Sequence, residues 1–188
     1  MNLKTSLNII PYRTILPTID KSAFIAYNAI ISGAVEIAKN SSIWYNCVLR
    51  GDVTKIVIGE NTNIQDGCIL HGTRPNHAQN KTGNCGAPAI IGNNVTIGHN
   101  AIIHACTIED NAFIGMGSIV MDLARVEQFG MLGAGGVLTP GKIIKSGQIW
   151  AGNPAKYFRD LTQVERDYIK ISADNYYELA QEYKLSSI

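Results

Sequence analysis

The sequence predicts an all-β fold, a parallel β-helix of hexapeptide repeats that ends in a C-terminal α-helix. Large apolar residues recur at every sixth position, small residues mostly lie two positions before them, and the spacing becomes helical near the C-terminus. Six residues make a short strand and a turn, and three such repeats make one triangular coil. A sandwich of alternating strands needs no fixed phase of six, so the repeat favours the β-helix.

The six-residue phase continues through most of the chain with three interruptions. Three extra residues follow Leu49, a longer insertion occupies roughly 73–88, and one residue is missing after Ile103. The phased positions are aliphatic except the last, as expected of inward-facing core residues. In chain order they are Ile19, Ile25, Ile31, Ile37, Ile43, Leu49, Ile58, Ile64, Leu70, Ile91, Ile97, Ile103, Ile108, Ile114, Val120, Val126, Leu132, Leu138, Ile144 and Trp150.

The chain divides into three predicted parts. Residues 1–18 are an extended lead-in that covers the first coil, and residues 19–155 form the β-helix. Pro154 ends the repeat because proline cannot donate to a strand ladder. Residues 156–188 form a C-terminal helical segment, where Thr162 and Glu165 have the spacing of a capping box. A helix of about five turns is expected to pack back along the β-helix.

Composition excludes several functional classes. The 188 residues carry a net charge of +1 and no basic run, which argues against nucleic-acid binding. No apolar run is long enough to span a membrane and the N-terminus lacks a signal-peptide pattern, so we expect a soluble, cytoplasmic protein. The four cysteines show no Cys-x-x-Cys spacing, which favours a reduced state. Cys47, Cys68 and Cys106 fall at small inward positions and are expected to pack, whereas Cys85 lies in the insertion.

The register of the repeat brings distant histidines together. Counting each insertion as a corner loop, Leu70 and Ile103 lie one coil apart on the same face. His71 and His104, the residues that follow them, should therefore stack about 4.8 Å apart in a column that continues to Arg50. Two neutral stacked imidazoles can bind one metal ion, and a catalytic zinc site needs a third protein ligand. His99 lies around the preceding corner, so we predict that a threefold assembly brings His99 of one subunit to the pair of another.

Five segments resemble the γ-class carbonic anhydrase-like family of left-handed β-helix proteins. They are Arg50-Gly-Asp52, Asn63-Ile-Gln-Asp-Gly-Cys-Ile-Leu-His71, Ile97-Gly-His-Asn-Ala-Ile-Ile-His104, Gly115-Met-Gly-Ser118 and Ala151-Gly-Asn-Pro-Ala155. The resemblance implies a left-handed helix and a homotrimer with zinc, or else iron or cobalt, between subunits. It implies that His71 and His104 of one chain and His99 of its neighbour are the ligands, and that a metal-bound hydroxide hydrates carbon dioxide reversibly to bicarbonate. It also implies an interface ion pair of Arg50 and Asp52 near the site, with Asp66 close by, and a hydrogen bond from Gln65 to the hydroxide or substrate.

The sequence departs from active members of this family at two places. Val53 occupies a position where they carry glutamate, and the segment after His71 has no acidic residue to export a proton. His77 in the insertion could serve instead, since imidazole titrates near neutrality. Two alternatives therefore stay open: a coenzyme A-dependent acyltransferase of the hexapeptide class, and a non-catalytic metal-binding trimeric protein.

Overall fold

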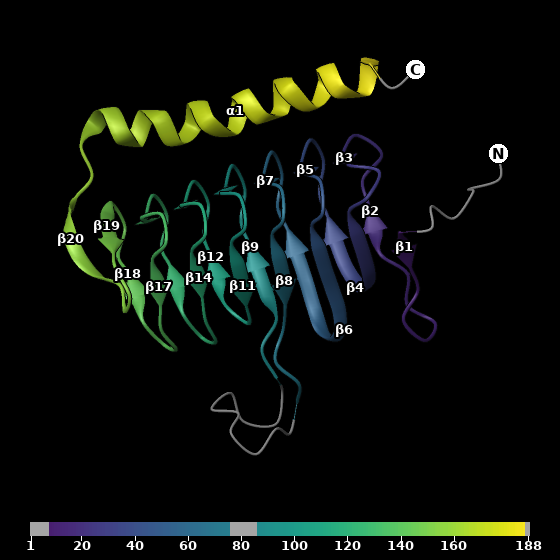
Figure 1. Ribbon diagram of the computed structural model, residues 1–188, viewed down its shortest axis with the longest axis horizontal. Coiled ribbons are helices and arrows are strands. Elements are labelled where there is room, and N and C mark those ends of the chain that lie inside the picture. Colours follow the sequence, from purple (N-terminus) through teal and green to yellow (C-terminus); the bar gives the residue numbers. More distant parts are fainter. Residues whose placement is uncertain (1–7, 76–85, 187–188) are drawn as a thin grey trace.

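The computed structural model describes residues 8–75 and 86–186, and in it the chain forms a parallel β-helix with one long helix along its side (Figure 1). Successive coils stack side by side from the N-terminal to the C-terminal end of the solenoid. Seven parallel strands follow one another on the face below the helix, one for each coil. The sequence suggested a proton-transfer role for His77 and assigned no role to Cys85. Both residues lie outside the described residues.

The strands form three faces. The first face contains β1 (Ile9–Ile10), the first parts of β4 (Ile30–Ile37) and β6 (Val48–Ile58), β8 (Ile69–His71), β11 (Ile102–His104), β14 (Ile119–Val120) and β17 (Val137–Leu138). The second face contains β2 (Thr18–Ile19), the later parts of β4 and β6, β9 (Ala89–Ile91), β12 (Thr107–Ile108), β15 (Arg125–Val126) and β18 (Ile143–Ile144). The third face contains β3 (Phe24–Ile25), β5 (Ser42–Ile43), β7 (Asn63–Ile64), β10 (Thr96–Ile97), β13 (Phe113–Ile114), β16 (Met131–Leu132) and β19 (Gln148–Ala151).

The predicted inward positions form the core. Every phased aliphatic residue from Ile31 to Ile144 is buried in one continuous cluster, and Ile19, Ile25 and Trp150 at the two ends are partly buried against it. The small column is also inward, and Cys47, Cys68 and Cys106 are buried free thiols, which confirms their predicted packing role. Large and small side chains thus alternate inside each coil and fill the narrow triangular interior.

The three extra residues after Leu49 are accommodated where β6 turns from the first face to the second. Gly33 pairs with Gly51 and Val35 with Ile56, so two steps along β4 match five steps along β6. The ladder then resumes in register, with Ile37 opposite Ile58. The insertion therefore changes the corner and leaves the phase of the core intact.

Asparagine sets many of the corners. Asn46, Asn61 and Asn100 have φ values of 59°, 51° and 59°, in the left-handed region that asparagine tolerates better than most residues. Stacked amides add cross-coil support, since Asn61 Nδ2 donates to Asn94 Oδ1 at 3.0 Å. The turn residues thus fix where each face begins.

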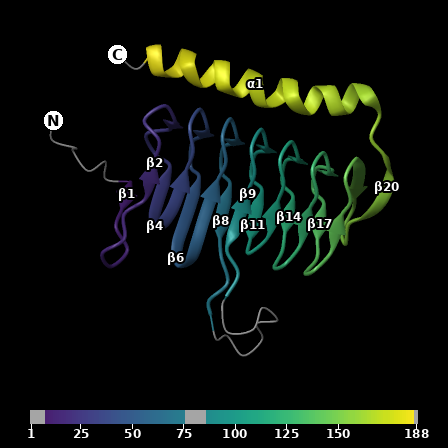
Figure 2. The same ribbon diagram turned by 180° about the vertical axis from the view of Figure 1, so that it is seen from behind.

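Helix α1 (Gln163–Ser186) covers the third face and spans the length of the stack when viewed from either side (Figures 1 and 2). The predicted capping box is present: Glu165 accepts from the Thr162 backbone N–H at 2.9 Å, and the Glu165 N–H donates to Thr162 Oγ1 at 3.3 Å. The 24-residue helix is longer than the five turns expected. Its buried side chains are Ile169, Ser172, Ala173 and Ala180.

Strand β20 (Lys156–Asp160) precedes the helix within residues 156–188, the segment that the sequence predicted as helical with a capping box at Thr162 and Glu165. It turns back and pairs antiparallel with β19, at the end of the solenoid. All five of its residues are exposed, so no periodic burial pattern marks it in the sequence. Within the parts of the chain that the structure describes, no helix combines the length and apolarity needed to cross a membrane.

Candidate metal centre

His71 and His104 lie side by side on the first face. His71 at the end of β8 pairs in register with His104 at the end of β11, and Arg50 of β6 pairs with His71 on the other side. Side chains alternate along a strand, so the residue after inward-facing Leu70 or Ile103 points outward. The two imidazole centroids are 5.3 Å apart. The column that the sequence predicted is therefore confirmed.

Each of these two histidines has one ring nitrogen bonded to a carboxylate. His71 Nε2 lies 2.8 Å from Asp52 Oδ1, and His104 Nδ1 lies 2.6 Å from Asp122 Oδ1. An ionised carboxylate can only accept, so these two ring nitrogens carry the hydrogens. The other nitrogens, His71 Nδ1 and His104 Nε2, face each other at 3.2 Å. In neutral rings both present lone pairs, an arrangement that a cation between them would stabilise.

The surroundings favour neutral imidazole at His71 and ionised carboxylates beside the pair. Burial lowers the pKa of His71, and the positive charge of Arg50 lowers it further. The hydrogen bond with Asp52 raises the pKa but does not outweigh these two effects. Burial raises the pKa of Asp52, but hydrogen bonds with His71 and Arg50 outweigh it and hold the pKa below its ordinary value. The pKa of Asp122 is likewise lowered, because hydrogen bonds from a threonine hydroxyl and His104 outweigh its burial. Neutral imidazole is the form of histidine that binds metals.

The spacing of the two facing nitrogens suits a tetrahedral metal ion. Zinc–nitrogen bonds of about 2.0–2.1 Å place two ligand nitrogens about 3.4 Å apart, close to the 3.2 Å between His71 Nδ1 and His104 Nε2. Metal-binding histidines usually donate their second ring N–H to a carboxylate, as both of these do. The donor set therefore fits zinc, and imidazole ligands also suit iron.

His99 lies at the corner between the third face and the first, after β10 and before β11. Its Nδ1 is 2.9 Å from Asp66 Oδ2, and its Nε2 is 3.5 Å from the hydroxyl of Tyr176 on α1. Across residues 8–75 and 86–186 of a single chain, no three His, Cys, Asp or Glu side chains group into a metal site. One chain thus presents a histidine pair on the first face and a third histidine at the adjoining corner.

Gln65 and Asp66 hold the His99 corner. The buried Gln65 side chain accepts from the His99 backbone N–H at 3.2 Å and donates to Asn63 Oδ1 at 3.1 Å. A glutamine amide has two hydrogens, so a second one is available for a further acceptor. Asp66 accepts from the Tyr45 backbone N–H at 3.2 Å through the oxygen that does not bond His99.

The sequence prediction missed three side chains that contact the histidines or their carboxylates: Thr73, Asp122 and Tyr176. Arg50 and Asp52, which it named, form an ion pair within the chain. A signal for the position of Asp122, though not for the direction of its side chain, existed, because it lies two residues after the phased Val120, which pairs with Ile103 of the preceding coil. Thr73 and Tyr176 carried no such signal, since one begins the insertion and the other lies on the helix.

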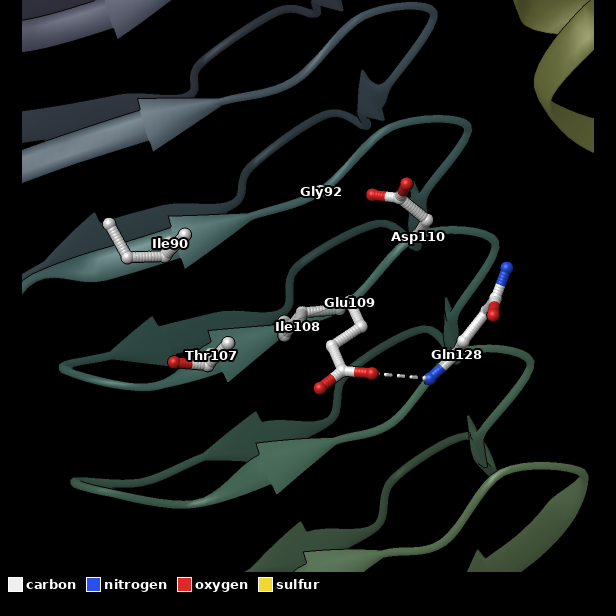
Figure 3. A pocket seen from close by; sticks show the side chains of 7 residues that line it. All are labelled: Ile90, Gly92, Thr107, Ile108, Glu109, Asp110 and Gln128. Atoms are coloured by element: carbon white, nitrogen blue, oxygen red, sulfur yellow. Dashed lines mark hydrogen bonds between the residues drawn. The ribbon is translucent and has the colours of Figure 1, made fainter.

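A hollow of about 360 Å³ lies on the second face, apart from the histidine column (Figure 3). Its carboxylates are already bonded: Glu109 accepts from Arg125 Nε at 2.6 Å and from the Gln128 N–H at 3.0 Å, and Asp110 accepts from the Asn93 N–H at 2.7 Å. These contacts tie neighbouring coils together. The lining residues are Ile90, Gly92, Thr107, Ile108, Glu109, Asp110 and Gln128.

The chain is similar to known proteins along most of its length. A protein from Geobacillus kaustophilus named "Carbonic anhydrase" is 40% identical, and the match covers 95% of each chain. The chain belongs to the γ-class carbonic anhydrase-like family. "Gamma carbonic anhydrase 2, mitochondrial" of Arabidopsis thaliana is 48% identical over 88% of this chain, and this chain matches 58% of that relative's length.

Structural similarity to a solved protein also covers most of the chain. A hexapeptide transferase family protein from Anaplasma phagocytophilum has 51% sequence identity and a TM-score of 0.84, over 93% of this chain and 96% of that one. The family described as "Bacterial transferase hexapeptide (six repeats)" matches residues 88–122, which run from β9 to the turn that carries Asp122.

Proposed function

We propose that this chain forms a homotrimeric, metal-dependent carbonic anhydrase that interconverts carbon dioxide and bicarbonate. The facing lone pairs of His71 and His104, each ring backed by a carboxylate, carry the proposal. Relatives named carbonic anhydrase support it. When bound, a divalent metal lowers the pKa of its coordinated water to about 7 and so supplies a nucleophile at neutral pH. Zinc is the proposed metal, with iron or cobalt as alternatives.

The chain's own side chains would hold and orient the reactants. Asp52 keeps Nε2 of His71 protonated and thereby directs Nδ1 to the metal position. Arg50 pairs with Asp52 and balances its charge. The second amide hydrogen of Gln65 is suited to donate to an oxygen of carbon dioxide or bicarbonate, because its other contacts fix the amide plane.

The outward side chains of the first face support self-association. β-branched aliphatics form an outward-facing ladder along this face, in which Ile30, Ile69 and Ile102 are 40%, 46% and 38% exposed and the other members are half-buried. At the equivalent positions the second face interrupts its aliphatic residues with polar and charged ones, and the third face is covered by α1. The second-face residues are Thr18, Glu36, Val57, Ile90, Thr107, Arg125 and Ile143. Uncovered apolar patches of this kind mark interfaces. The ladder consists of Ile30, Val48, Ile69, Ile102, Ile119 and Val137.

A cyclic arrangement would complete the site. His99 lies at the edge of the face that carries the pair, so packing the first face of one subunit against this corner of the next would bring His99 to His71 and His104. A threefold ring uses such head-to-tail contacts and closes. Each trimer would then hold three equivalent sites.

Subunit mixing tests both the metal site and its shared construction. His71→Ala and His99→Ala trimers should each lose bound zinc and carbon dioxide hydration, measured by elemental analysis and stopped-flow assay. Coexpressing the two variants in equal amounts should restore about one quarter of the sites, because random assembly pairs an intact His71–His104 with an intact neighbouring His99 in that fraction. Gln128→Ala on the second face is the control and should change neither quantity. No restoration on mixing would contradict a shared site.

The same samples separate the alternatives. Acetyl-coenzyme A turnover that persists with a chelator present would support an acyltransferase. The name of the Anaplasma phagocytophilum protein refers to a hexapeptide transferase family. A zinc-replete trimer that hydrates no carbon dioxide between about pH 6 and 9, where metal-bound water ionises, would support non-catalytic metal binding.

A further inference from the structure

We propose that Asp122, anchored by Thr73, is a positioning residue that fixes the orientation and tautomer of His104. The inference rests on the proposed metal site. Asp122 lies in the turn after β14, and its Oδ1 accepts from His104 Nδ1 at 2.6 Å. Its Oδ2 accepts from the Thr73 hydroxyl. Because both oxygens are engaged, the carboxylate cannot turn away from the imidazole without losing a bond.

The same three-part arrangement occurs at each of the three histidines. An anchor donates to one oxygen of a carboxylate, and the histidine donates its ring N–H to the other. This repetition is independent of the metal and assigns Asp122 the same role as the two aspartates next to the other histidines. The three sets are Arg50–Asp52–His71, the Tyr45 backbone N–H–Asp66–His99, and Thr73–Asp122–His104.

His104 depends on its carboxylate more than His71 does. The side chain of His71 is 19% exposed, so packing restrains its ring. The side chain of His104 is 37% exposed, so less packing opposes rotation of its ring about the Cβ–Cγ bond. A half-turn of the ring would exchange Nε2 for a carbon atom opposite His71. The bond to Asp122 is the contact that selects the orientation in which Nε2 faces His71 Nδ1.

Thr73 is itself fixed by the backbone around it. Its N–H donates to the Ala87 carbonyl at 2.9 Å, and the Ala87 N–H donates back at 3.1 Å. Thr54 Oγ1 of the preceding coil donates to the same Ala87 carbonyl at 3.1 Å. A Cβ on Gly72 would overlap Thr54 Oγ1, at 1.9 Å, so glycine is needed there for the strands to approach this closely. The base of the insertion thus supports the ligand through Asp122.

The test compares zinc affinity of the trimer in chelator competition. Asp122→Ala should weaken zinc binding by about 10- to 100-fold, the usual effect of removing an outer-shell partner. Thr73→Val, which removes only the hydroxyl, should weaken it in the same direction by a smaller factor. The matched controls are Asp110→Ala, which removes a turn carboxylate on the second face that bonds Asn93 and no histidine, and Thr107→Val. Both controls should leave zinc affinity unchanged.

A second readout uses no metal. Nitrogen-15 NMR of the four histidines in metal-free protein should show His104 with hydrogen on Nδ1, and Asp122→Ala should shift it towards hydrogen on Nε2. Unchanged zinc affinity together with an unchanged His104 tautomer in Asp122→Ala would overturn the positioning role while leaving the metal site intact. Absence of zinc binding by the wild-type trimer would instead overturn the proposed function, and the tautomer measurement would still decide the role of Asp122.

Discussion

At the scale of single residues, Glu165 shows how strongly local hydrogen bonds lower the pKa of a carboxyl group. Its carboxylate accepts from the Arg159 guanidinium at 2.8 and 2.7 Å and from the Thr162 hydroxyl at 2.9 Å. These bonds, with that from the Thr162 N–H, lower the pKa of Glu165 from 4.5 to about 2. The cluster joins the end of β20 to the start of α1, so it stabilises the point where the chain leaves the solenoid.

Glu165→Gln should therefore lower the melting temperature in a pH-dependent way. A carboxyl whose pKa falls on folding stabilises the protein above its unfolded pKa, and that contribution is lost as pH falls through the folded value. The difference in melting temperature between wild type and variant should be full at pH 7 and shrink between about pH 4.5 and 2. Glu178→Gln, on the exposed middle of α1, is the control. A difference that stays constant down to pH 2 would contradict the assignment.

Residue-level prediction from the sequence succeeded where the repeat supplied the geometry. His71, His104 and Arg50 follow phased core residues, so counting alone placed them in one column. Asp122 was missed because it lies in a turn, where its direction depends on local backbone and not on strand alternation. The bonding of His99 to Asp66 and Tyr176 depends on side-chain rotamers and helix docking, which no periodicity encodes.

At the scale of elements, inward and outward positions alternate over single residues. On β18, Ile144 is fully buried while its neighbour Ile143 is 38% exposed on the second face. The core interior is narrow and close-packed, so a cavity there cannot easily collapse. Ile144 should therefore contribute much more than Ile143 to the free energy of unfolding.

Ile144→Ala should cost about 2–5 kcal/mol of unfolding free energy, the range for removing a fully buried isoleucine. Ile143→Ala should cost less than about 1 kcal/mol, as is usual away from buried features. Urea unfolding at one fixed protein concentration would measure both, because oligomer stability depends on concentration. Equal midpoint shifts for the two variants would contradict the inward assignment of Ile144.

The elements that the sequence missed lack this alternation. β20 has no buried residue, so only its pairing with β19 defines it. The helix was expected to be shorter because its apolar residues at helical spacing run only from Val164 to Tyr183, and two of them, Leu179 and Tyr183, stay more than one-third exposed. Parallel coils, by contrast, bury one phased residue per strand, which is why the solenoid itself was predictable.

At the scale of the whole molecule, the three faces have different roles. The third face is occupied by α1, the second carries cross-coil ion pairs such as Glu109–Arg125 and Glu127–Lys145, and the first carries the apolar ladder and the histidine pair. Assembly and metal binding are proposed to use the same face. A substitution in the ladder should therefore lower metal occupancy even though it changes no metal ligand.

Ile102→Lys should shift the trimer towards monomer and lower zinc occupancy, because a desolvated ammonium opposes burial of the ladder. Analytical ultracentrifugation and elemental analysis would measure the two effects on the same sample. Ile143→Lys is a matched control, since Ile143 is equally exposed at 38% but lies on the second face. A trimer that survives Ile102→Lys with full zinc content would rule out the first face as the interface.

The column that contains the histidines has a consequence for how such a site can arise. Ser32, Arg50, His71 and His104 occupy the same outward position in successive coils. Two adjacent substitutions in this column are enough to create or remove a facing imidazole pair, and neither disturbs the inward residues that specify the fold. The imidazole pair can thus be lost during evolution in one mutational step while the solenoid stays the same, whereas a new metal site also needs supporting carboxylates and a third ligand.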